Sequence, residues 1–88
     1  MKKNQINPPE LNSSPIQLSA AIQGQQLRLI QIDAGKQVAH RLTELGLTPG
    51  VELTIVHDSG GPMVLSVRDS RVAIGRGMAG KLRVEPIL

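Results

Sequence analysis

The chain has 88 residues and a formal net charge of +3, and it contains no cysteine and no aromatic residue. These features exclude disulfides, thiolate catalysis and cysteine-based zinc sites, and they leave only aliphatic side chains to build a core. Its ten basic and seven acidic residues are interspersed, and no ring is available to stack on a base, so nucleic acid is a poor candidate partner.

The N-terminal segment, residues 1–15, is rich in Asn, Pro and Ser and has few side chains to bury. We predict a flexible tail there, followed by one small domain over residues 16–88. The lysines near the start precede no apolar stretch, and no apolar run approaches the roughly 18 residues of a membrane-spanning helix. We therefore expect a cytoplasmic protein without a signal peptide.

Residues 26–32 form the first convincing strand. Leu27 and Leu29 share one face of it, whereas Ile30 and Ile32 lie on the other. This change of phase predicts a β-bulge, or a strand that is covered on both faces.

A short helix is predicted next, over residues 36–45, with apolar side chains at helical spacing: Val38, Leu42 and Leu45. If Gly46 is the first residue beyond the helix, Leu42 and Leu47 make the apolar contact of a Schellman ending. Pro-Gly at residues 49–50 then supplies the two central positions of a type II turn.

After this turn the apolar period changes to two, which predicts four further strands: residues 51–55, 63–67, 72–74 and 81–85. They are separated by a turn at 58–62, a hairpin turn at 68–71 and an irregular turn at 75–80 with one helical turn. We predict a mainly β fold, a small barrel of five short strands with one short helix between strands one and two. SH3-like and OB-like barrels both fit this pattern.

The two histidines, His40 and His57, have no neighbouring histidine. A divalent ion at His57 and Asp58 would need Glu52 or Glu85 as well, and adjacent strand residues point to opposite faces. We expect surface histidines, with no metal and no cofactor.

Two glycine-rich stretches, at 60–61 and 75–77, lack the helix N-terminus and the Lys-Ser/Thr pair of a phosphate-binding loop. They are typical of turns. No catalytic triad or carboxylate pair is indicated, so we expect a protein that is not an enzyme.

Protein contact is then the favoured role. The turn position of Leu47 and Pro49 predicts that both are exposed, whereas Leu42 and Leu45 are assigned to the core. Met63 and Met78 fit gap filling in a core without aromatic rings, or flexible contacts on a surface. The candidate interface residues are Leu45, Gly46, Leu47, Pro49 and Met63.

The run RLTELGLTPGVELTIV, residues 41–56, resembles the signature of the FeoA family, in which a helix ending in Leu-Gly-Leu enters a Pro-Gly turn and a strand. Later segments are similar to the family in the same order: Gly60 with Pro62 and Met63 before the third strand, a hairpin over 67–74, and a closing segment over 79–84. The likeness covers about residues 16–87. Gly75 departs from it, because an apolar residue is common there in the family, and Gly61 stands where the family often has aspartate.

The resemblance implies an SH3-like barrel and a small cytosolic accessory protein of bacterial ferrous-iron transport. Its implied partner is the FeoB membrane transporter, which has a cytosolic GTP-binding domain; weak self-association is a second expectation. The alternative is a general interaction or regulatory module, related to the C-terminal SH3-like domain of metal-dependent repressors. Since no helix-turn-helix precedes the barrel, a DNA-binding repressor is disfavoured.

Overall fold

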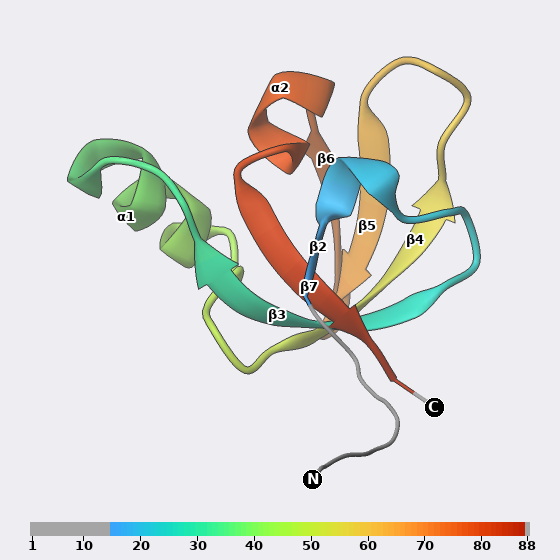
Figure 1. Cartoon of the computed structure of the whole chain (residues 1–88), viewed down its shortest axis with the longest axis horizontal. Coiled ribbons are helices and arrows are strands. Elements are labelled where there is room, and N and C mark those ends of the chain that lie inside the picture. The colour runs from blue at the N-terminus through green and yellow to red at the C-terminus, as the bar shows by residue number, and fades with distance from the viewer. Residues whose placement is uncertain (1–14, 88) are drawn as a thin grey trace, which may run out of the picture.

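The computed structural model describes residues 15–87. Its elements in chain order are β2 (Ile16–Gln17), the 3₁₀ helix η2 (Leu18–Ala20), β3 (Gln26–Ile32), α1 (Lys36–Glu44), β4 (Glu52–His57), β5 (Met63–Val67), β6 (Ser70–Ile74), α2 (Arg76–Ala79) and β7 (Leu82–Pro86). All the strands are antiparallel and form one curved sheet in the order β2-β7-β3-β4-β5-β6 (Figure 1).

The predicted mainly β barrel is confirmed, with the helix α1 between the first long strand and the second. The structure adds a sixth strand, β2, in which Ile16 pairs with Val84 and Gln17 with Arg83. Two residues are too few to show a period, so the sequence pattern could not identify this strand. The predicted tail lies outside the described residues except for Pro15.

The phase change in β3 is a β-bulge, as predicted: the register against β7 shifts between Leu29 and Gln31. Leu27 and Leu29 are fully buried, and beyond the bulge Ile32, which pairs with the buried Leu82, packs against the same core. The bulge therefore bends β3 toward α1, whose first turn follows after a short connection (Figure 1).

The end of α1 is also as predicted. Gly46 has φ +91°, its N–H donates to the carbonyl of Thr43 at 2.9 Å, and the N–H of Leu47 donates to the carbonyl of Leu42 at 2.9 Å. These are the two hydrogen bonds of a Schellman motif. Gly50 has φ +96°, and the N–H of Val51 donates to the carbonyl of Thr48 at 3.0 Å, which closes the type II turn.

The core is entirely aliphatic apart from one methionine, and every buried residue within 15–87 is apolar. The ten largest fully buried side chains come from all parts of the described chain: Leu18, Leu27, Leu29, Leu47, Ile55, Met63, Leu65, Val67, Leu82 and Val84. With no aromatic ring to enlarge it, this core depends on each of its leucines.

An ion pair between Asp58 and Arg76 connects the β4–β5 loop to α2. Arg76 also donates to the carbonyl of Ser19 at 3.4 Å, so η2 joins the same link. The Arg76 guanidinium holds the pKa of the Asp58 carboxyl below its ordinary value of 3.8, against the opposing effect of partial burial; the N–H of Gly60 and the charge of His57 add to the lowering.

We expect this link to weaken in acid. A folded pKa below the unfolded one means that the contribution is present above about pH 4 and is lost as the pH falls through the folded value. Melting temperatures followed by circular dichroism from about pH 7 to about pH 2 should show Asp58→Asn below wild type at neutral pH and equal to it in acid. Arg76→Gln should lose the same pH-dependent part and keep a smaller gap in acid, because it also loses the contact with the Ser19 carbonyl; the double variant should lose no more than Arg76→Gln. A gap that stays constant over the whole range would contradict this assignment.

Candidate partner-binding groove

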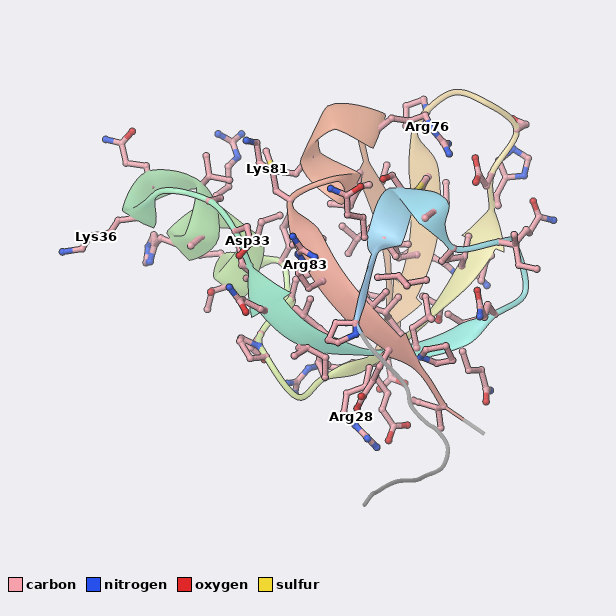
Figure 2. The ribbon with its side chains drawn as sticks, viewed as in Figure 1. Arg28, Asp33, Lys36, Arg76, Lys81 and Arg83 are labelled. Carbon is pink, nitrogen blue, oxygen red and sulfur yellow. The ribbon has the colours of Figure 1, made fainter. Side chains whose placement is uncertain are left out.

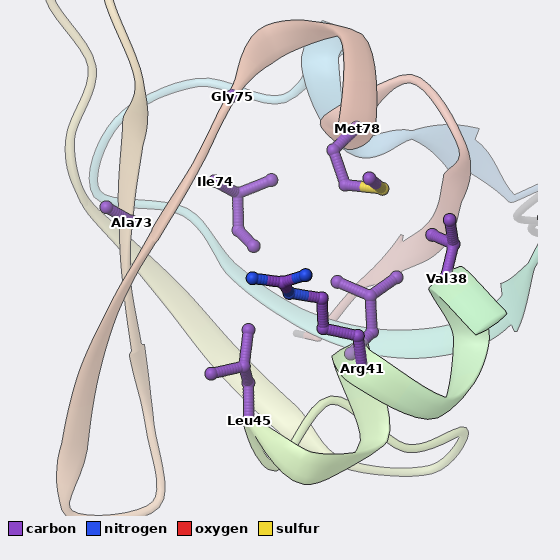
Figure 3. A pocket seen from close by; sticks show the side chains of 8 residues that line it. Val38, Arg41, Leu45, Ala73, Ile74, Gly75 and Met78 are labelled. Atoms are coloured by element: carbon purple, nitrogen blue, oxygen red, sulfur yellow. The ribbon is translucent and has the colours of Figure 1, made fainter.

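A groove of about 340 Å³ separates α1 from the segment formed by β6 and α2 (Figure 3). One wall comes from α1 and the other from residues 73–78. The lining residues are Val38, Arg41, Leu42, Leu45, Ala73, Ile74, Gly75 and Met78. Arg41 is the only charged side chain among them, so the groove is apolar with one cation at its mouth.

The groove exists because the apolar stripe of α1 extends past the barrel. Leu42 is 3% exposed and packs into the core, whereas Leu45, one turn further along, is 44% exposed. Ile74 is 3% exposed and closes the floor from the β6 side. The two buried side chains, Leu42 and Ile74, thus form the floor of the groove, and Leu45 and the partly buried Met78 lie nearer the surface.

The cations beside the groove are not neutralised. Arg41 reaches from the last turn of α1 across the groove (Figure 3), and Arg71 is exposed on β6, two residues before Ala73. Within residues 15–87 neither forms a salt bridge. The other arginines that lie in strands or in α2 do pair with carboxylates. Arg83, for example, pairs with Asp33 at 2.8 Å (Figure 2). The groove therefore carries positive charge that an acidic partner could neutralise.

Two of the predicted interface residues are in the core. Leu47 is 0% exposed, so the prediction that it is exposed is wrong: the Schellman ending turns its side chain inward toward Leu42. Met63 is also 0% exposed, because it begins β5 on the face that points into the barrel, opposite Ile74. Neither can touch a partner unless the fold opens.

The other three lie at or near the surface. Leu45 lines the groove, so its assignment to the core is wrong, and its role in an interface stays a prediction. Gly46 is half-buried with Val67 and Arg68 nearby, and Pro49 is exposed in its turn but does not line the groove. The sequence reasoning missed Val38, Arg41, Ala73 and Ile74 as lining residues. The helical stripe of α1 indicates Val38, whereas the sequence of β6 gives no such signal, because the curvature of the sheet sets its place opposite α1.

Both histidines are exposed. His57 Nε2 lies 3.1 Å from the Ser59 hydroxyl, and His40 Nε2 lies 3.5 Å from the Glu44 carboxylate on α1. Within residues 15–87 no three His, Asp or Glu side chains gather where a metal ion could bind. None of the helices in this range has the length and apolar character needed to span a bilayer.

The fold defines a class of protein: a small SH3-like β-barrel. Comparison with known families then places it, because the FeoA domain model matches residues 16–86, and the chain belongs to that family. The family is one of transport accessory proteins rather than enzymes.

Known proteins agree with this assignment. The chain is 37% identical over 68 residues to the putative Fe(2+) transport protein A of Methanocaldococcus jannaschii, covering 77% of this chain and 83% of that protein. A crystal structure of an iron uptake regulatory protein (FeoA) superimposes with a TM-score of 0.79 at 31% identity, covering 84% of this chain and all of that one.

A manganese-dependent transcriptional repressor also contains this fold. It matches with a TM-score of 0.77 at 18% identity, covering 90% of this chain but 45% of the repressor. At that identity the likeness concerns the fold alone. The match confirms an SH3-like barrel. The strand periodicity alone fits an SH3-like and an OB-like barrel equally well.

Proposed function

We propose that this protein is a non-enzymatic cytoplasmic accessory of ferrous-iron transport that acts by contacting the cytosolic side of a FeoB-type membrane transporter. The FeoA family and the 37% identical iron-transport relative support the iron-transport part. The contact with the transporter goes beyond both and is supported by the surface of the molecule.

The apolar groove between α1 and β6–α2 is the observation that carries the contact. Leu45 and Met78 hold apolar surface near water there, and burying a leucine fully is worth about 1.5–3 kcal/mol. A groove of about 340 Å³ has room for a few side chains of a partner.

The test is restoration of ferrous-iron uptake in a bacterium that lacks its own small accessory protein. The wild-type chain should restore uptake and should be retained by the detergent-solubilised FeoB-type transporter from the same source. A chain that folds, as seen by circular dichroism, but restores no uptake and is not retained would contradict the proposal. That result would favour the general interaction or regulatory module instead.

A further inference from the structure

The strand β6 ends the sheet, and one of its edges has no strand beside it within residues 15–87. Its register against β5 runs from Val67↔Ser70, across a two-residue connection, to Met63↔Ile74. The pair that closes such a hairpin exchanges hydrogen bonds, and these exchanges recur at every second residue. The N–H and C=O groups of Arg71 and Ala73 therefore point away from β5, toward the free edge.

This free edge borders the groove. Ala73 and Ile74 are successive strand residues, so their side chains point to opposite faces of β6, yet both line the groove, as does Gly75. The groove thus runs along the edge of β6 rather than over one face of it (Figure 3). Across from the edge stands the apolar wall of α1, with Leu42 and Leu45.

Charge indicates what kind of segment fits. Arg71 lies on the outer side of β6 with Ala73, and Arg41 crosses the mouth of the groove. Neither has a carboxylate partner within residues 15–87. A strand added beside β6 lies about 4.7–4.9 Å from it, so side chains on its outer face come close to Arg71. Carboxylates are favoured at those positions, and lysines are disfavoured.

We propose that the groove takes an extended, acidic segment of the partner, which adds to the sheet as a strand along the free edge of β6. Its backbone pairs with Arg71 and Ala73. Its inward side chains are apolar and pack between Ile74 and Leu42, while its outward side chains include carboxylates that face Arg71 and Arg41. This inference rests on the proposed function only in assigning the segment to the transporter.

A second copy of this chain is a poorer occupant. If two β6 edges paired antiparallel through Arg71 and Ala73, each Arg71 would lie opposite Ala73 of the other copy and diagonal to its Arg71. Diagonal neighbours lie about 7–8 Å apart, within reach of long side chains, so the two arginines would repel each other.

The first experiment uses two nine-residue peptides as probes, one alternating valine with glutamate and one alternating valine with lysine, titrated into the ¹⁵N-labelled protein. The glutamate peptide should bind at least about tenfold tighter than the lysine peptide, with shifts confined to α1, β6 and α2. Amide hydrogen exchange at Arg71 and Ala73 should slow when it is bound, a result that side-chain contact alone would not give. No binding of either peptide at millimolar concentration, or unchanged exchange at these two amides in the complex, would overturn the proposal.

Three variants test the two recognition elements separately. Ala73→Pro removes an N–H that β5 does not use, and proline is tolerated in edge strands, so binding should fall by at least about tenfold. Ala73→Thr changes the same side chain but keeps that N–H, so it should bind the glutamate peptide more tightly than Ala73→Pro does. Arg41→Glu should reverse the preference between the two peptides. If Ala73→Pro fails to fold, hydrogen exchange on the wild-type chain and the Arg41→Glu reversal decide the matter.

Retention by the transporter separates this inference from the proposed function. Equal retention of wild type and Ala73→Pro would leave the proposed function standing and overturn strand addition. No retention of a folded wild-type chain would count against the proposed function, while the peptide titration still decides whether β6 accepts a strand. A dimer seen by sedimentation, and lost in Ala73→Pro, would assign the edge to a second copy and overturn the proposed occupant.

Discussion

Leu47→Ala should lower the free energy of unfolding by about 2–5 kcal/mol, as expected for a fully buried leucine that leaves a cavity. That is a large share of the roughly 4–13 kcal/mol expected for a chain of this length. Leu45→Ala, at a side chain that is 44% exposed, should cost less than about 1 kcal/mol. Urea unfolding followed by far-ultraviolet circular dichroism measures both, since the chain has no tryptophan or tyrosine to serve as a fluorescent probe.

Leu47→Asp extends the same comparison. A carboxylate at this site has no polar group to pair with in an all-apolar core, so the variant should be largely unfolded. Equal stabilities of Leu47→Ala and Leu45→Ala would show that the end of α1 is not packed as described. A folded Leu47→Asp would do so as well.

The second large effect concerns binding. Leu45→Asp should keep the melting temperature within a few degrees of wild type and reduce retention by the transporter by at least about tenfold, because it places a charge on the apolar wall of the groove. Ile22→Asp is the matched control: Ile22 is 69% exposed, precedes β3 and does not line the groove. The control should bind as wild type.

Both aspartate variants are measured for retention by the transporter and for melting temperature, because loss of binding is informative only in a folded variant. Loss of binding in both aspartate variants would point to charge rather than to the groove. Full retention of Leu45→Asp would remove Leu45 from the interface and leave Pro49 as the exposed candidate that sequence reasoning supplied.

Local chemistry explains what the sequence could predict. The Schellman ending, the type II turn and the bulge each depend on a few consecutive residues, such as Gly46 with φ +91° and Gly50 with φ +96°. The sequence assigns Leu45 to the core and Leu47 to the surface, and the structure shows the reverse. A helical stripe shows which side chains share a face of the helix but not what lies opposite that face. The stripe of α1 continues beyond the barrel, so its last leucine meets a groove instead of the core.

The groove itself could not be predicted. Its two walls are separated in the chain by β4 and β5, and only the curvature of the sheet brings Ala73 opposite Leu42. The strand pattern placed β6 in the sheet without showing that it would be last. No short stretch of the sequence therefore indicates the free edge of β6 or the charge that Arg41 places beside it.

Gly75, which begins α2 beside the groove, has an ordinary backbone conformation with φ −65°, and a methyl group there would meet no heavy atom outside its immediate neighbours within 4 Å. The fold therefore does not require glycine at this position. What glycine leaves is room at the α2 end of the groove. Gly75→Ala would therefore add a methyl group to this end of the groove without a clash in the barrel.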